Sequence, residues 1–356
     1  MRSKPRKGSR VLGLALFLVF FLATLLPKTH AQSQLDLLLK TGVEIDTNPA
    51  RLTDQGSSTD VAQRLFASFD YATLDSDNLL RLDVRLGGKV FADRSEEDAV
   101  MTLASAAYEY RGFGELRLLA SMSVQDRSER GHVRDYARFS PSFGTRLQLD
   151  PVWVSIIAQP EVFLFKPDSD LNNVAIGGAA SIGWDPSELW SLSASYSMNR
   201  RSYSQETLNI SEESIALGDD LRVDWNHTAG LSLAYSGTVF VRVGAYAQRN
   251  ESNSDGKQFW RYVARVGATA ELPGALFLDL HGSLQRTVFD QIGFVDPTFT
   301  IDDENRNTVE VTLSRDLLDW MRIEARYSVF LQEFGGDETS YERHLGYLGL
   351  TFQVGD

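Results

Sequence analysis

The chain has 356 residues, no cysteine and a formal net charge of −13 at pH 7. The acidic balance disfavours nucleic acid as a partner, and the absence of cysteine excludes both a disulfide framework and a lipoprotein anchor. A mean hydropathy of −0.21 with 23% charged residues argues against a membrane protein built from helices, yet it is compatible with a large barrel whose inner face is polar.

The N-terminal segment, residues 1–31, has the pattern of a secretory signal peptide. Basic residues between Arg2 and Arg10 precede the apolar run Val11–Leu26, and Ala31 ends a cleavage site before Gln32. The alternative is an uncleaved anchor, although the apolar run is short for a membrane span. Cleavage would remove six Lys and Arg and no acid, which would change the net charge from −13 to −19.

From residue 32 to residue 356, segments of alternating apolar and polar residues follow one another, separated by turn-forming residues. In Trp320–Gln332 the row that begins at Met321 is apolar, while the other row holds Arg322, Glu324 and Arg326. This period of two predicts a strand with one apolar and one charged face. At about thirteen residues the segment exceeds the roughly five or six of a soluble sheet, but suits a tilted membrane-crossing strand of about 9–11.

The same pattern predicts sixteen strands. Pro160 lies inside one of them, where its missing N–H predicts a bulge. In chain order the predicted strands are Leu35–Ile45, Val61–Thr73, Leu79–Ala92, Val100–Arg111, Glu115–Gln125, Tyr136–Leu149, Val152–Phe165, Val174–Trp184, Leu189–Arg200, Leu221–Tyr235, Thr238–Gln248, Phe259–Glu271, Leu276–Val288, Thr308–Ser314, Trp320–Gln332 and Tyr341–Val354.

The connections between these strands alternate in length. Tight turns such as Asp150–Pro151 and Leu317–Asp319 alternate with longer acidic loops, among them Arg201–Asp220 and Phe289–Asn307. A closed up-and-down barrel predicts this alternation, with short turns on the periplasmic side and long loops outside. Tryptophans flank both ends, as an interfacial girdle requires: Trp153, Trp184, Trp190 and Trp320 lie beside short turns, and Trp225 and Trp260 lie near the opposite rim.

The fold class that follows is all-β, a closed antiparallel transmembrane barrel over residues 32–356. A soluble sandwich is the alternative, but its strands would be shorter. Backbone groups in hydrocarbon are satisfied only when the sheet closes. The nearly uncharged row of each strand is therefore expected to face lipid, and the charged row an aqueous lumen.

Strand parity assigns a set of charged residues to the lumen wall. A barrel of sixteen strands is too wide for its side chains to fill, so these residues are expected to line a pore. They would either guide anionic solutes or form a lattice of ion pairs that stiffens the wall, and the sequence leaves both open. The predicted pore-lining residues are Lys40, Arg64, Arg81, Arg85, Lys89, Arg117, Arg138, Arg146, Arg242, Arg261, Arg265, Arg322, Arg326, Asp83, Glu161, Asp279 and Glu324.

One short motif suggests an enzyme. His281 and Ser283 share a strand face, as in the His-x-Ser pair of outer-membrane phospholipases. Parity nevertheless places both with Asp279 on the lumen side, away from a lipid substrate. We therefore predict no catalytic residues, and the sequence contains no metal-ligand cluster and no cofactor motif.

The chain from residue 32 onward resembles the Gram-negative outer-membrane β-barrels. Its last strand carries Leu348, Leu350 and Phe352, similar to the C-terminal assembly signal of that class, although the chain continues to Asp356. The segment Gly42–Pro49 loosely resembles the opening of sixteen-stranded polysaccharide-export barrels. The resemblance implies residence in the outer membrane, contact with its lipid and insertion by the barrel-assembly machinery.

Two functions fit these features. The first is a channel for polar or anionic material, with an exported polysaccharide among the cargoes and periplasmic export proteins as partners. The second is a structural barrel that anchors an envelope machine for secretion or motility. Lipolysis is a minor third.

Overall fold

The computed structural model describes residues 32–49, 58–210, 215–290, 307–332 and 341–355. The predicted signal peptide lies outside them. No helix in the described part of the chain is long and apolar enough to cross a membrane.

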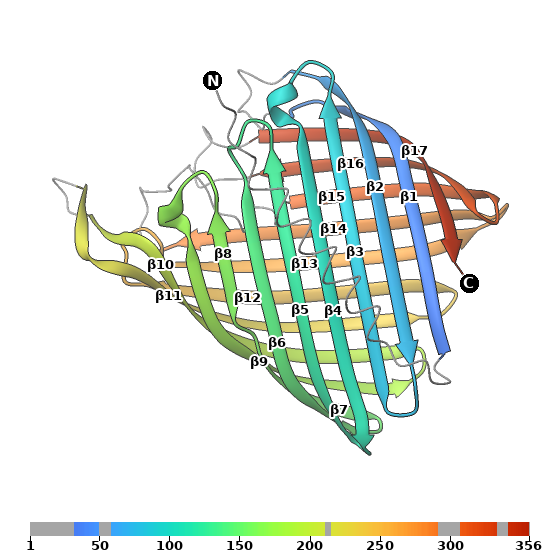
Figure 1. Ribbon diagram of the computed structural model, residues 1–356, viewed down its shortest axis with the longest axis horizontal. Helices are drawn as coiled ribbons and strands as arrows, with labels where there is room; N and C mark the ends of the chain where they lie inside the picture. Colours follow the sequence, from blue (N-terminus) through green and yellow to red (C-terminus); the bar gives the residue numbers. More distant parts are fainter. Residues whose placement is uncertain (1–31, 50–57, 211–214, 291–306, 333–340, 356) are drawn as a thin grey trace, which may run out of the picture.

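The described strands form one closed antiparallel sheet (Figure 1). The first strand pairs along one edge with the second strand and along its other edge with the last, so the sheet has no free edge along the barrel wall. The seventeen segments make a barrel of sixteen strands, because β7 and β8 both lie between β6 and β9 and together form one interrupted strand of the barrel. The predicted barrel and its strand number are confirmed.

The strands agree closely with the predicted ones, and most are one to four residues longer at their ends. They are β1 (Gln32–Asp46), β2 (Asp60–Leu74), β3 (Asn78–Phe91), β4 (Ala99–Phe113), β5 (Leu116–Glu129), β6 (Tyr136–Leu149), β7 (Val152–Ala158), β8 (Glu161–Phe165), β9 (Asn173–Ser187), β10 (Trp190–Ile210), β11 (Ile215–Ser236), β12 (Val239–Ser252), β13 (Phe259–Leu272), β14 (Leu276–Phe289), β15 (Asn307–Leu318), β16 (Met321–Gln332) and β17 (Tyr341–Gly355).

The two ends of the barrel differ. One end carries the short turns, and β1 begins and β17 ends there (Figure 1). The other end carries the longer connections, including two short 3₁₀ helices, η1 (Ser95–Glu97) and η2 (Ser169–Leu171). We call these the short-turn end and the long-loop end. The turn predicted at Leu317–Asp319 is tighter than expected, since β15 continues to Leu318.

The barrel strand formed by β7 and β8 is interrupted at Pro160, as the missing proline N–H predicts. β7 ends at Ala158 and β8 begins at Glu161, and between them the Gln159 N–H still donates to the carbonyl of Gly177 at 2.8 Å. The predicted bulge is therefore a two-residue break that the neighbouring strands span.

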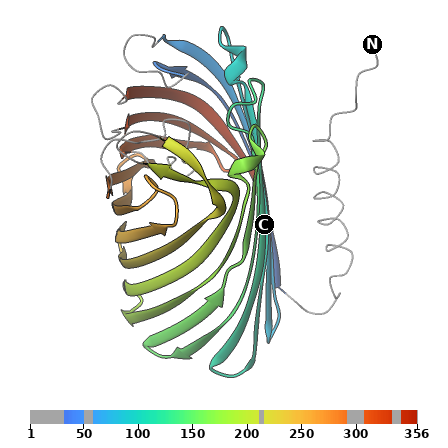
Figure 2. The same ribbon diagram turned by 90° about the vertical axis from the view of Figure 1, so that its left-hand side faces the viewer.

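The loop predicted at Arg201–Asp220 is wrong over most of its length. β10 and β11 contain 21 and 22 residues, and beyond Tyr203 they pair with each other as a two-stranded ribbon, with register shifts on either side of Glu206. Figure 2 shows this ribbon, in yellow, extending across the long-loop end of the barrel. The loop between β12 and β13 braces it, because the Leu208 N–H donates to Ser254 Oγ at 2.9 Å.

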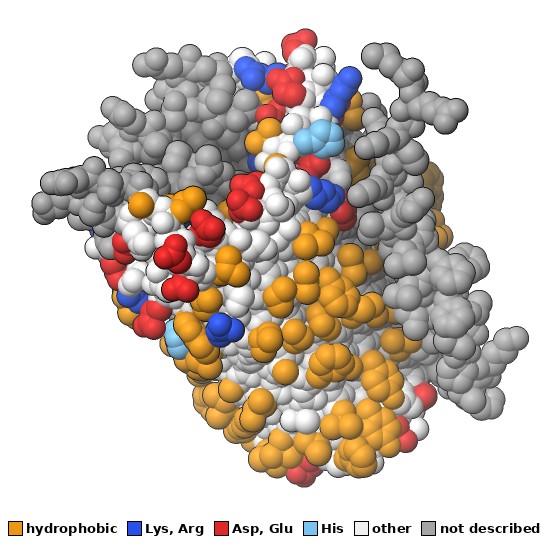
Figure 3. Space-filling view, turned by 60° about the vertical axis from the view of Figure 1, so that its left-hand side comes forward, with side chains coloured by type: hydrophobic (Ala, Val, Ile, Leu, Met, Phe, Trp, Pro, Cys, Tyr) orange, Lys and Arg blue, Asp and Glu red, His pale blue; other side chains and the backbone are white. Residues whose placement is uncertain are grey.

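Hydrophobic side chains cover the outside of the sheet. Figure 3 shows them as a broad apolar region on the face in view, with acidic side chains gathered at the long-loop end and a few at the opposite end. Leu65, Ile156, Leu231 and Leu284 are each more than half exposed. Such an apolar band on a closed sheet is the surface of a barrel that lies in lipid.

Candidate functional site: the inner wall of the barrel

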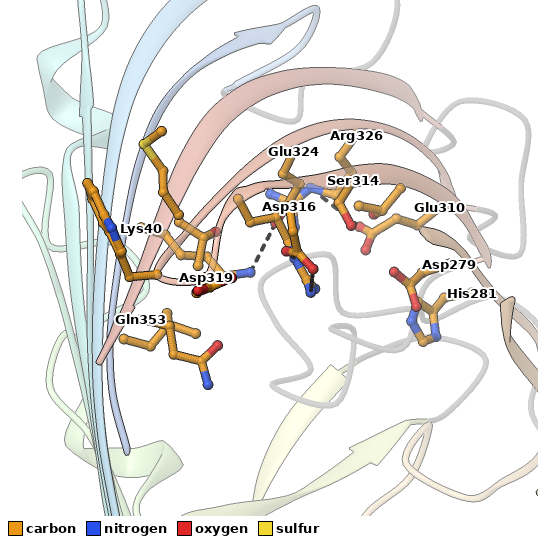
Figure 4. Close-up of a pocket in the computed structure, with 16 residues that line it drawn as sticks. Lys40, Asp279, His281, Glu310, Ser314, Asp316, Asp319, Glu324, Arg326 and Gln353 are labelled. Carbon is orange, nitrogen blue, oxygen red and sulfur yellow. Dashed lines mark hydrogen bonds and ion pairs between the residues drawn. The ribbon is translucent and has the colours of Figure 1, made fainter. Parts of the chain in front are cut away.

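The register places every predicted lumen residue on a single face of the sheet. Directly opposite residues of antiparallel strands point to the same side. Lys40 of β1 is opposite Thr351 of β17, which is opposite Arg322 of β16. When such opposed residues are followed from strand to strand around the barrel, the path returns to the face of Lys40, so all of them lie on one face. Figure 4 shows Lys40, Glu324 and Asp279 projecting into the barrel.

A cluster of five charged groups joins the first, second, third and last strands at the long-loop end. We call it the seam cluster: Glu44, Asp46, Arg64, Lys89 and Arg343. Arg343 Nε donates to Asp46 Oδ1 at 2.8 Å, and Lys89 Nζ lies 2.5 Å from Glu44 and 3.0 Å from Asp46. Arg64 completes it at 2.6 Å from Glu44. Both acids are buried, so the seam cluster joins the strands that close the barrel.

Other predicted residues also form ion pairs on the inner wall, all between strands except Arg85–Asp83, which lies within β3. Lys40 lies 3.0 Å from Glu324, and Glu161 lies between Arg138 at 3.7 Å and Arg201 at 3.3 Å. The further pairs are Arg85–Asp83 at 2.9 Å, Arg117–Glu109 at 3.0 Å, Arg322–Asp316 at 2.6 Å and Arg326–Glu310 at 4.0 Å. The lattice of ion pairs that sequence left as an alternative therefore forms over part of the wall.

Three of the predicted arginines have no acidic partner among the described residues: Arg81, Arg146 and Arg242. Each lies three residues from the short-turn end of its strand. Arg146 and Arg242 belong to the β5–β12 side of the wall, where serine and glycine replace acids on many inward positions, as in the opposed pair Ser193 and Ser232. The wall thus has a side of paired charges and a side with an excess of cations.

Aromatic rings contact several of the inward arginines, a feature that the alternation of inward and outward residues does not predict. On β12 and β13 the guanidinium carbon of Arg242 lies 5.8 Å from the ring centre of Phe240, that of Arg265 lies 5.4 Å from Tyr246, and that of Arg261 lies 4.8 Å from Phe259. We call these three pairs the arginine–aromatic track, because they follow one another from the short-turn end to the long-loop end. Cation–π contact of this kind holds a guanidinium in place without neutralising its charge.

Trp153 corrects one expectation about the girdle. It lies on the inner wall, where the guanidinium of Arg146 stacks 4.7 Å from its ring and Gly183 on β9 leaves room beneath it. Trp184 and Trp190 lie on the outer face, where they are 49% and 44% exposed. Trp320 lies in the turn before β16, and its ring stacks on that of Phe352 with 6.0 Å between the ring centres. Parity alone would have placed Trp153 inside, since it pairs with Gln148 and lies two residues from Ser155.

The His281–Ser283 motif does not form a nucleophile and base pair. Both lie on the inner face, as expected, but Ser283 Oγ is buried without a hydrogen-bond partner among the described residues. Asp279 accepts a 2.6 Å hydrogen bond from Thr269. His281 and Asp279 line a recess of about 250 Å³ in the wall, together with Glu310 (Figure 4). In the described part of the chain no group of three or more His, Asp or Glu is placed to hold a metal ion.

Comparison with known proteins identifies the fold. No family model matches the chain, and no curated protein matches it either. The chain is similar to the structure of Salmonella typhi OmpF in complex with daunomycin, with a TM-score of 0.53 and 11% identity over 90% of this chain and 97% of that one. Acinetobacter baumannii OccAB3 gives a TM-score of 0.46 with 9% identity, over 91% of this chain and 100% of that one. The fold is therefore that of the outer-membrane porins.

Proposed function

We propose that this protein is a channel of the bacterial outer membrane through which polar, and preferentially anionic, material passes. The observation that carries the proposal is the unbroken register, which separates an apolar outer face from a largely polar inner face around the whole barrel. Barrels of sixteen strands leave an aqueous interior. Fixed charges on the wall of such an interior then select among permeating ions.

The preference for anions rests on the cationic side of the wall. Arg146 and Arg242 lie at the same distance from the short-turn end, and neither has an acidic partner among the described residues. On the opposite side, pairs such as Lys40–Glu324 cancel one another at short range. An anion crossing near β5–β12 therefore meets uncompensated positive charge, whereas a cation gains little on either side.

Single-channel recording in planar bilayers tests both parts of the proposal. Residues 32–356 should form channels with stable openings. In a KCl gradient the reversal potential should lie closer to the equilibrium potential of chloride than to that of potassium. Replacing both Arg146 and Arg242 by Ser should lower the chloride-to-potassium permeability ratio by about twofold or more. Arg315→Ser, an exposed arginine of the outer face, is the matched control and should change nothing. A folded barrel without openings would refute the channel.

An acidic polysaccharide is the cargo that the arginine–aromatic track supports best. The track places a cation and a ring at three levels on two adjacent strands, which suits an extended polymer that carries repeated carboxylates or phosphates. An acidic oligosaccharide should therefore block the open channel in a voltage-dependent manner. Arg265→Ala should weaken this block more than it weakens block by a neutral oligosaccharide of equal length, and equal loss for both would refute this cargo.

A further inference from the structure

The outer face of β10–β14 contains a concave region bordered by aromatic rings. One row of opposed residues, from β10 to β14, consists of Tyr196, Ala229, Ala247, Tyr262 and Arg286. The two tyrosines are each about half exposed, at 48% and 49%, and the two alanines between them are small. Neighbouring strands lie about 4.8 Å apart, so the tyrosines border a floor roughly 14 Å across.

The next row toward the short-turn end continues the same floor. It contains Ala245 and Ala264, with Leu231 and Leu284 rising on their sides, at 63% and 65% exposed. Apart from Tyr196, the members of the two rows line an open recess of about 720 Å³ on the outside of the barrel. We call this recess the alanine groove. Its lining is almost entirely apolar, except that Arg286 lies at the end nearer the long loops.

Two basic residues lie beyond the alanine groove, toward the long-loop end. His227 and Arg249 lie directly beyond Ala229 and Ala247 on the same strands and are opposite each other. His227 Nδ1 is hydrogen-bonded to the Tyr196 hydroxyl at 2.8 Å. Arg249 is bound in bidentate fashion by Asp290, at 2.8 and 2.7 Å, and lies 3.9 Å from Glu251.

Arg286 differs from Arg249 in its surroundings. It is exposed, and it has no ion-pair partner among the described residues. Its neighbour across the sheet is Tyr262, whose ring stacks on Trp260 with 6.2 Å between the ring centres and an interplanar angle of 8°. An uncompensated guanidinium therefore lies where the apolar band of the outer face ends and the interfacial aromatic residues begin.

From this arrangement we infer that the alanine groove binds an anionic phospholipid, with an acyl chain on the alanine floor and the phosphate at Arg286. The groove matches a hydrocarbon chain in polarity, and guanidinium groups form strong charge-assisted hydrogen bonds with phosphate. The inference rests on the membrane location in the proposed function and not on conduction through the lumen. A second copy of this chain is the other occupant to test, since an apolar face can also bury itself against a partner.

Native mass spectrometry of the folded barrel, residues 32–356, in mild detergent tests the inference. The probes are dioleoylphosphatidylglycerol, dioleoylglycerol with the same acyl chains and no phosphate, and inorganic phosphate. We expect one tightly held phosphatidylglycerol, while dioleoylglycerol and inorganic phosphate each bind at least about tenfold more weakly. Arg286→Ala should weaken phosphatidylglycerol binding about tenfold, and Ala247→Phe should fill the groove and do the same.

Arg315→Ala is the matched control, because it removes an exposed outer-face arginine on β15 at the opposite end of the barrel. It should leave binding unchanged. Heat-dependent mobility in gels confirms that each variant is folded, and unchanged single-channel conductance of Arg286→Ala separates this inference from the channel proposal. Equal binding of both lipids, unaltered binding by Arg286→Ala, or oligomers that Ala247→Phe dissociates would each overturn it.

Discussion

The seam cluster gives a prediction about how the barrel is held closed. Asp46 is fully buried, the side chain of Arg343 is 9% exposed, and the two residues join β1 to β17 through a bidentate contact. Removing one partner of a buried ion pair typically costs about 3–5 kcal/mol, because the remaining charge stays buried. Lys89 lies 3.0 Å from Asp46 and still compensates part of that charge. For Arg343→Met we therefore expect a loss of about 3 kcal/mol in the free energy of unfolding.

The assay is urea unfolding of the barrel in lipid vesicles, followed by tryptophan fluorescence. The control is Arg85→Met, which breaks the Asp83 pair on the same wall, where the arginine side chain is 51% exposed. It should cost less than about 1 kcal/mol. The double variant Asp46→Leu with Arg343→Met should regain part of the loss, since the buried Asp46 carboxylate is removed with its partner while Glu44 still pairs with Arg64 and Lys89. If Arg343→Met costs no more than Arg85→Met, the seam cluster does not stabilise closure.

Two further predictions concern a turn and a close contact inside the barrel. Backbone N–H donation, first from Asp77, holds the pKa of the Asp75 carboxyl below its ordinary 3.8. Asp75→Ala should therefore destabilise the barrel near neutral pH, and its difference from the wild type in urea unfolding should vanish as the pH falls below 3.8 and through the lower folded pKa. A Cβ at Gly183 would overlap the Trp153 ring, so Gly183→Ala should cost about 1–3 kcal/mol of unfolding free energy. Adding Trp153→Leu should remove most of that cost, and a cost that persists in the double variant would contradict the contact.

The barrel could be predicted because each of its strands needs one apolar face toward lipid, and this need appears as alternation in the sequence of the strand. In Trp320–Gln332, as in the other segments, one row must be apolar to meet lipid and the other is free to carry charge, so a period of two marks both the strand and its faces. The same rule assigned Lys40, Arg242 and Asp279 to the inner face, where the register places them. Only residues that lie within the apolar band need to follow this alternation.

The ribbon beyond Tyr203 shows where that rule stops. Outside the band no row needs to be apolar, so residues 204–210 and 215–220 have the composition of a loop although they lie in β10 and β11. What holds it is tertiary: backbone pairing within the ribbon, and the contact from Ser254 on the neighbouring loop to Leu208.

The amino-acid sequence by itself determined the strands, their number and the face of most charged side chains, because alternation is a local property of the chain. Only the tertiary structure decided which charges meet. Asp46 and Arg343 are 297 positions apart, and their contact exists because the sheet closes with one particular stagger of β1 against β17. The alanine groove likewise arises because the register brings small residues of adjacent strands side by side. The sequence of one strand alone does not show which residues of the next strand lie beside it.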